Sequence, residues 1–142
     1  MRMSTKAQYA VRALVSLNLT SDGLPVTIKE ISDRENISLN YLEQLFVKLR
    51  RGNIVRSVRG PGGGYILARP ATDIRLDEIV DTVEETLVPL SCMNADGSCS
   101  CDSECTTQLV WQGLGNQVRD FLASMTLEDL TNDGRRRRQV AH

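Results

Sequence analysis

The chain has 142 residues, of which 41% are hydrophobic and 25% are charged, the composition of a globular protein with one core. No apolar run reaches the roughly 18 residues that a membrane helix requires, and the first residues do not form a secretory signal. We therefore expect a cytoplasmic protein without a membrane segment.

Charge divides the chain into a basic and an acidic half. Residues 1–70 contain 11 Lys and Arg and 5 Asp and Glu, whereas residues 71–142 contain 6 and 13. The halves carry net charges of +6 and −7, which give the overall charge of −1. A basic half favours a polyanionic partner, although solvated surfaces often show an imbalance of this size.

The start of the chain predicts two helices. Apolar residues recur at helical spacing from Ser4, a suitable N-cap, to about Leu19. Thr27 and Glu30 have the spacing of a capping box and predict a short second helix, which ends at a tight break at Asn36.

A third helix is predicted from Leu39 to about Arg51, with Ser38 as its N-cap and Gly52 as a left-handed C-cap. One face is an apolar stripe for the core: Leu42, Leu45, Phe46 and Leu49. The other face is mainly polar and suits base edges and phosphates: Asn40, Tyr41, Glu43, Gln44, Val47 and Lys48. A group of arginines that would bind a phosphate backbone follows: Arg50, Arg51, Arg56 and Arg59.

Two short strands are predicted at residues 54–58 and 65–67, joined by the glycine-rich loop at 59–64. The loop lacks the Lys-Ser/Thr pair and the following helix of a nucleotide-binding loop. Three helices followed by a hairpin form the order of a winged helix-turn-helix, in which the third helix enters the major groove. The glycine loop would be the wing, with Arg59 inserted into a narrow minor groove.

Beyond the hairpin, a fourth helix is predicted from Leu76 to Val83 and a long one from Leu109 to about Met125. The long helix carries an apolar seam for a partner helix, made by Val110, Leu114, Val118, Phe121 and Met125, with Trp111 and Leu122 beside it. The expected fold is mostly α with a small β-hairpin wing. Its parts are a winged domain at 1–86, a cysteine-rich loop at 87–107, a dimerisation helix at 108–131 and a disordered tail at 132–142.

All four cysteines fall within one 14-residue segment, at Cys92, Cys99, Cys101 and Cys105. Such clustering indicates shared chemistry, and an iron–sulfur cluster, a zinc ion and redox-active thiols are all compatible with it. Structural zinc sites usually show two short Cys-x2–4-Cys pairs, which this spacing lacks.

Three features together resemble the bacterial iron–sulfur cluster regulator IscR family: the segment Ser38–Phe46, the segment Val58–Tyr65 and the downstream cysteines. The resemblance runs from Met1 to about Leu130. It implies a homodimeric winged-helix transcription factor that binds double-stranded DNA at a pseudo-palindromic operator. One member type represses its own cluster-assembly operon when it carries a 2Fe–2S cluster, and its cluster-free form still binds a second class of sites.

Carried over by residue, the resemblance implies base contacts from Asn40, Glu43 and Gln44 and insertion of Arg59 into the minor groove. The position of Glu43 is associated with discrimination between cluster-dependent and cluster-independent sites. It also implies phosphate or positioning contacts at Tyr9, Ser38 and Lys48, and we count Tyr41 and Gly60 among the DNA-binding residues.

The family's ligand pattern, Cys-x5-Cys-x5-Cys-x2-His, is altered in this chain. Cys92, Cys99 and Cys105 fit it with one extra residue in the first spacer, and Gln108 stands where histidine is expected. The fourth ligand is therefore open between Cys101, Gln108 and a residue of another helix or subunit. Thiolate is the softer donor and favours Cys101, whereas the carbonyl oxygen of glutamine is a poor iron ligand.

The sequence thus predicts a cluster-sensing, homodimeric transcription regulator, mainly a repressor, of cluster-biogenesis genes. A 2Fe–2S cluster is favoured, and 4Fe–4S fits four cysteines as well. The alternatives are a nitric-oxide-sensing, redox-sensing or zinc-binding regulator of the same fold, and a cluster scaffold or electron carrier. No nucleophile–base pair is present and the only histidine is His142, so we do not expect an enzyme.

Overall fold

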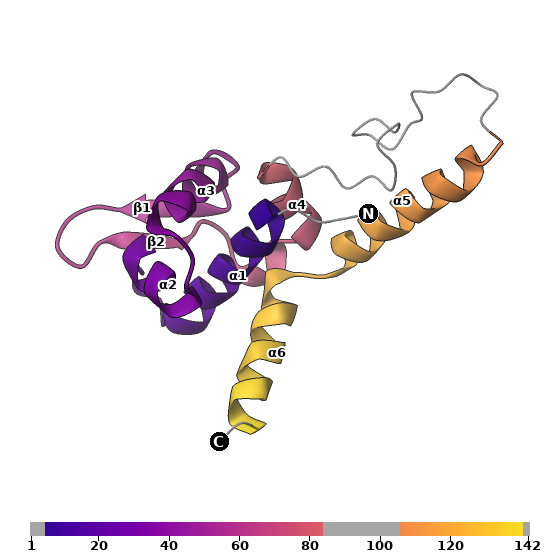
Figure 1. Cartoon of the computed structure of the whole chain (residues 1–142). Helices are drawn as coiled ribbons and strands as arrows, with labels where there is room; N and C mark the ends of the chain where they lie inside the picture. Colours follow the sequence, from indigo (N-terminus) through magenta and orange to yellow (C-terminus); the bar gives the residue numbers. More distant parts are fainter. Residues whose placement is uncertain (1–4, 84–105, 141–142) are drawn as a thin grey trace.

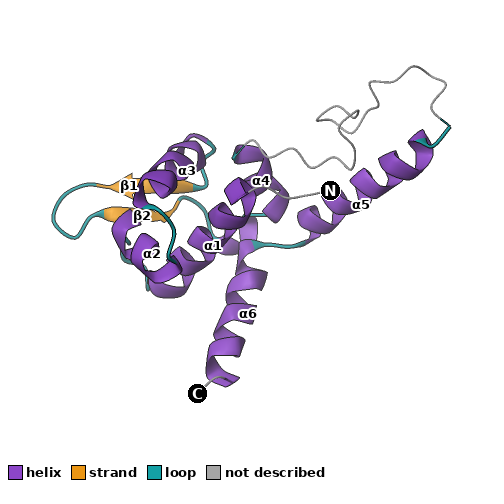
Figure 2. Cartoon of the chain, viewed as in Figure 1, coloured by secondary structure: helices purple, strands orange, loops and turns teal. Residues whose placement is uncertain are grey.

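The computed structural model describes residues 5–83 and 106–140 (Figure 1). Its helices and strands are α1 (Thr5–Thr20), α2 (Ile28–Glu35), α3 (Leu39–Arg51), β1 (Val55–Val58), β2 (Gly64–Leu67), the short 3-10 turn η1 (Ala71–Asp73), α4 (Leu76–Thr82), α5 (Gln108–Ser124) and α6 (Leu127–Val140). Among these residues the hairpin β1–β2 is the one sheet, and helices make up most of the rest (Figure 2). The expected class, mostly helical with a small β wing, is confirmed. No described helix is long and apolar enough to cross a bilayer.

Helix α1 is the central support of the winged domain. Its inner side is made mostly of small residues, and Ala10, Ala13 and Leu14 are fully buried. Because alanine adds little volume, neighbouring helices can approach the α1 backbone closely. The predicted N-cap Ser4 lies outside the described residues.

The junction between α2 and α3 forms as the sequence predicts. The Thr27 hydroxyl accepts from the Glu30 N–H (3.1 Å), and the Glu30 carboxylate accepts from the Thr27 N–H (3.3 Å), which completes the capping box. Asn36 then takes the left-handed conformation, with φ 54°, and turns the chain into α3. The Ser38 hydroxyl caps α3 by accepting from the Tyr41 N–H at 3.4 Å.

The end of α3 differs from the expected glycine C-cap. Gly52 has φ −81°, which any residue can adopt, and the left-handed residue is Asn53, with φ 59°. Glycine stands at position 52 for lack of space, because a Cβ built there would lie 2.5 Å from Thr82 Cγ2 and 2.8 Å from Thr82 Oγ1. The C-terminus of α3 therefore lies directly against the last residue of α4.

The wing is fixed at its base and free at its tip. β1 and β2 pair antiparallel, from Val55 opposite Leu67 to Val58 opposite Gly64. Tyr65 joins the base to the helices, because it exchanges backbone hydrogen bonds with Val26 (2.8 and 3.0 Å) and its ring meets Phe46 edge-on at 5.0 Å. The loop at the tip projects away from the helices (Figure 1).

The long helix predicted from Leu109 to about Met125 forms as α5, whereas the dimerisation segment expected at 108–131 contains the end of α5 and the start of a second helix, α6. Met125 is extended and separates the two helices, because its carbonyl accepts from the Leu76 N–H (3.0 Å) and the Leu127 N–H reaches back to the Ile74 carbonyl (2.8 Å). Leu127 is fully buried in the core of the winged domain. Asn18 of α1 donates to the buried Thr131 hydroxyl at 2.8 Å, so α6 packs back on α1.

The disordered tail expected at 132–142 is instead helical as far as Val140. Thr126 and Asp129 cap the start of α6 reciprocally: the Asp129 N–H donates to the Thr126 hydroxyl (3.2 Å), and the Thr126 N–H to the Asp129 carboxylate (2.9 Å). Further along, Asp133 pairs with Arg136 (2.6 Å) and Arg137 (2.7 Å), one turn away.

Candidate nucleic-acid interface

Asn40, Glu43 and Gln44 lie together on the outer face of α3. All three are exposed, and their spacing places them on the side opposite the buried stripe that contains Leu42 and Leu49. Asn and Gln side chains can each donate to and accept from an adenine, and a carboxylate can accept from cytosine. The face thus presents hydrogen-bonding groups of the kind that read base edges in a major groove.

Tyr41, by contrast, turns toward α1. It is half-buried, its hydroxyl lies 3.1 Å from the Thr5 hydroxyl, and its ring meets Tyr9 edge-on with centroids 5.7 Å apart. Tyr9 and Tyr41 therefore connect the N-terminal turns of α1 and α3. In the structure they fix the start of α3 against α1.

A surface hollow of about 470 Å³ lies between these two N-terminal turns. It brings together five of the residues predicted from the sequence, and its lining is Thr5, Tyr9, Asn36, Ile37, Ser38, Asn40, Tyr41 and Gln44. Hydroxyl and amide groups beside a helix N-terminus suit a phosphate oxygen, since the first N–H groups of the helix point toward it. Lys48 lies three turns further on the same helix and is half-buried.

The wing carries the second part of the predicted interface. Arg59 is exposed, and Gly60 and Gly62 have φ values of 97° and 74°, which glycine adopts without strain. The Gly63 N–H donates to the Gly60 carbonyl at 2.9 Å and closes the turn. Three more exposed arginines precede this turn in sequence: Arg50 and Arg51 in the last turn of α3, and Arg56 on β1.

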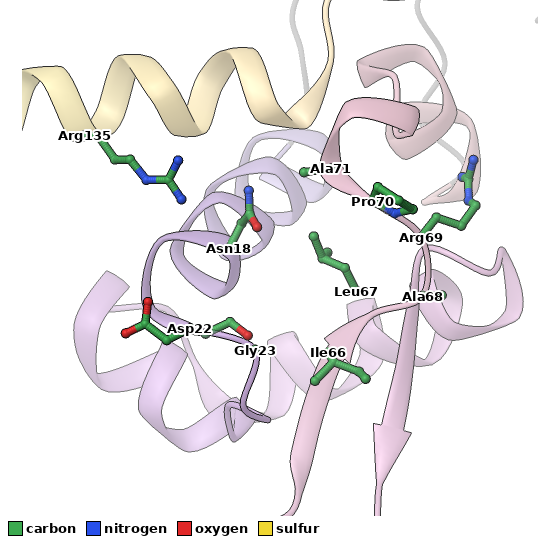
Figure 3. A pocket seen from close by; sticks show the side chains of 11 residues that line it. Asn18, Asp22, Gly23, Ile66, Leu67, Ala68, Arg69, Pro70, Ala71 and Arg135 are labelled. Atoms are coloured by element: carbon green, nitrogen blue, oxygen red, sulfur yellow. The ribbon is translucent and has the colours of Figure 1, made fainter.

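A larger hollow, of about 520 Å³, lies elsewhere (Figure 3). It is bordered by the end of α1, by the segment that follows β2 and by Arg135 of α6, and Figure 3 shows Asn18 and Asp22 on its α1 side. None of the DNA-binding or metal-binding residues predicted from the sequence lines it. Size alone therefore does not identify the predicted site.

The predicted cluster ligands Cys92, Cys99, Cys101 and Cys105 lie outside the described residues. Their competitor Gln108 is described: it is the first residue of α5 and is half-buried. Among residues 5–83 and 106–140 no three His, Cys, Asp or Glu side chains gather into a metal site. The described residues nearest to the cysteines in sequence are Val83, directly after α4, and Thr106, two residues before α5.

Sequence reasoning missed two positions that support the interface. Arg12 lies over the Tyr9 ring, 5.4 Å from its centroid, and donates to the Glu35 carbonyl at 2.6 Å, so it joins α1 to the α2–α3 turn. The Tyr9–Arg12 spacing of three residues on a helix is the signal that would have found it. Thr82 is the other, and nothing in the sequence indicates its contact with Gly52.

The profile of the Rrf2 family, described as "Iron-dependent Transcriptional regulator", matches residues 3–133. The chain belongs to the Rrf2 family. The HTH-type transcriptional regulator IscR of Pectobacterium carotovorum is 41% identical over 133 residues, which cover 94% of this chain and 80% of that protein. An HTH-type transcriptional regulator of Azotobacter vinelandii, ORF2, is 45% identical over 130 residues, covering 92% and 79%.

Solved structures of Rrf2-type winged-helix regulators share the fold. IscR of T. potens has a TM-score of 0.78 at 34% identity, covering 94% of this chain and 88% of that one. CymR, the global cysteine regulator of B. subtilis, has a TM-score of 0.79 at 30% identity, covering 93% and 97%. Within the Rrf2 family this chain is thus an IscR-like, DNA-binding transcriptional regulator, and its relatives are regulators, not enzymes.

Proposed function

We propose that this protein is a homodimeric regulator, mainly a repressor, that senses an iron–sulfur cluster and controls cluster-biogenesis genes. The observation that carries the proposal is the position of the cysteine segment. It connects α4, whose end touches the recognition helix, to α5, which presents an apolar face.

The DNA-reading half of the proposal assigns a role to each exposed group. Asn40, Glu43 and Gln44 would contact base edges, and Arg59 at the wing would enter the minor groove, where the negative potential is strongest. Ser38, Tyr9, Tyr41 and Lys48, with the backbone at Gly60, would hold phosphates or fix the helix. This division agrees with the structure, because the first group is exposed while Tyr9 and Tyr41 are packed together.

The donor set fits an iron–sulfur cluster. Cys92, Cys99 and Cys105, with Cys101 or Gln108 as the fourth ligand, offer at least three thiolates within one short segment. That segment leads into the N-terminus of a 17-residue helix, whose dipole favours an anionic thiolate centre. When bound, the cluster would supply a centre that is lost or altered when cluster supply, oxygen or nitric oxide changes.

The contact between Gly52 and Thr82 supports a route from this segment to DNA. Thr82 is the last residue of α4, and Val83 after it is fully buried. If the residues after Val83 changed their path, Thr82 would move with them. Thr82 lies so close to Gly52 that not even a Cβ fits between them, so α3 would be affected. The contact lies near the surface, since Gly52 is exposed and Thr82 is half-buried, but it is close enough for a shift of Thr82 to press on the end of α3.

Dimerisation is supported by one face of α5. Val110, Leu114 and Phe121 are 60%, 42% and 62% exposed, whereas Val118 and Leu122 pack against Ala7 and Val80 of the same chain. Met125 likewise packs on the core. The seam predicted from the sequence is thus divided, and its residues left for a partner are Val110, Leu114 and Phe121. The same helix extends away from the winged domain (Figure 1).

Two measurements test the cofactor. Iron, acid-labile sulfide and zinc are quantified in anaerobically purified protein, and Mössbauer and visible spectra are recorded for wild type, Cys101→Ser and Gln108→Ala. We expect iron and sulfide in equal amounts without zinc, and a cluster that is altered in Cys101→Ser and unchanged in Gln108→Ala. Zinc without sulfide would contradict the proposal.

An arginine substitution separates the regulator from a cluster scaffold. An operator is first selected from random duplexes with the wild-type protein. Arg59→Ala should weaken binding to it by tenfold or more, about 1.4 kcal/mol, and reduce the slope of log affinity against log salt by about one, with cluster content unchanged. The matched control Arg138→Ala removes an exposed arginine of α6 and should leave affinity within about twofold. Failure to select any operator would favour a scaffold or electron carrier.

A further inference from the structure

Val47 is an exposed apolar residue on the reading face of α3. Its side chain is 39% exposed, and it lies on the side of the helix opposite the buried Leu42 and Leu49. It follows Gln44 and Glu43 by three and four residues and therefore occupies the next turn of the same face.

Neither the helix nor the core accounts for this side chain. A β-branched residue has a lower helix propensity than the Lys, Arg or Gln that surround it. The α3 residues that enter the core are Leu42, Leu45, Phe46 and Leu49, and Val47 is not among them. Its methyl groups instead face the region that the proposed DNA-reading role of α3 assigns to the major groove.

We propose that Val47 is a specificity-determining residue that makes an apolar contact with the 5-methyl group of a thymine. The methyl group is the one apolar feature that distinguishes thymine in the major groove, and small aliphatic side chains are its usual partners. Asn40 and Gln44 on the same face carry the amide groups that pair with adenine. The three side chains together favour A·T pairs in each half-site.

The inference rests on the proposed reading role of α3, and the experiment separates the two. An operator is selected from random duplexes, and each thymine is replaced in turn by deoxyuridine, which removes only the 5-methyl group. In the wild type we expect one thymine of each half-site at which this change weakens binding about fourfold, the equivalent of one buried methyl group. In Val47→Ala the same replacement of thymine should alter affinity less than about 1.5-fold, because the two γ-methyl groups of valine that contact the thymine methyl are absent.

The matched control is Leu24→Ala, at an exposed apolar residue of the α1–α2 loop, which should keep the full deoxyuridine effect. Thermal unfolding of both variants verifies the fold, and Val47→Ala should be at least as stable as wild type, since alanine has the higher helix propensity. Two results would overturn the inference: no thymine sensitive to deoxyuridine in the wild type, or a sensitive thymine that stays sensitive in Val47→Ala. If no operator can be selected at all, the proposed function fails first.

Discussion

At the residue scale, the contact between Gly52 and Thr82 has the largest consequence. A methyl group at position 52 would overlap both branches of the threonine side chain, although the backbone there is unstrained. Glycine is required by the approach of two helices and not by conformation. The sequence suggests a conformational reason, since glycine after a helix usually marks a left-handed cap. Only the three-dimensional structure reveals the close approach of the two helices.

This distinction gives a prediction with an internal control. Gly52→Ala should lower the free energy of unfolding by about 1 kcal/mol, the lower end of the cost of overpacking, because Gly52 is exposed and the half-buried Thr82 side chain can shift in part. Adding Thr82→Ala should recover most of that loss, because it removes the two atoms nearest the new methyl group. Urea unfolding of the single and double variants measures both effects. A purely conformational role for Gly52 would leave the double variant no more stable than Gly52→Ala.

At the element scale, the predictable helices were those whose signals are local. The capping box at Thr27, the cap at Ser38 and the apolar stripe of α3 each lie within a few residues and form as expected. Periodicity indicated that the long helix ends at about Met125, but not that a second helix follows, because the start of α6 depends on Ile74 and Leu76, which are distant in sequence. Likewise, spacing alone could not decide which of two adjacent apolar faces of α5 packs on its own chain.

Helix α6 gives a prediction about pH. Hydrogen bonds from Arg137 and Arg136 hold the pKa of Asp133 below its ordinary value. A carboxylate whose folded pKa is lowered stabilises the helix above its unfolded pKa and loses this effect as the pH falls through the folded value. The amides of residues 133–140 should therefore be more strongly protected from exchange at neutral pH than below about pH 4.

The variant Asp133→Asn isolates this effect. It lacks the titrating group, so its amides at 133–140 should show weaker protection at neutral pH and no step near the acidic end. Hydrogen exchange followed by NMR measures both proteins, with the buried amides of α1 as the internal reference. An identical acidic step in Asp133→Asn would show that another group controls the end of α6.

At the scale of the whole molecule, α5 is expected to hold two copies together. Phe121→Asp places a charge on the exposed apolar face of α5 and should convert the dimer to a monomer. Operator affinity should fall by a factor of about 100 or more, because simultaneous binding to two half-sites is lost. Asn116→Asp makes the same charge change on an exposed, polar side of α5 and should remain dimeric. Analytical ultracentrifugation reports the mass; a wild-type monomer at micromolar concentration would contradict a dimeric operator.

The sequence predicted the family, the winged fold and the exposure of Asn40, Glu43 and Gln44 on one face of α3, because these depend on motifs of adjacent residues. It did not predict that Tyr41 turns toward Tyr9, that α6 returns to α1, or that α3 and α4 touch at Gly52, because each depends on packing between distant segments. The last of these contacts connects the two halves of the proposed mechanism.

The central claim is that the state of the cysteine segment changes how the winged domains bind DNA. The most direct measurement is the affinity of one protein preparation for a selected operator at fixed salt, before and after its cluster is removed anaerobically. We predict a difference of about tenfold or more at one class of operator, the size of a typical coupling between two sites, and none in a variant with Cys92, Cys99 and Cys105 changed to alanine. Equal affinity of the two forms at every operator would contradict the account.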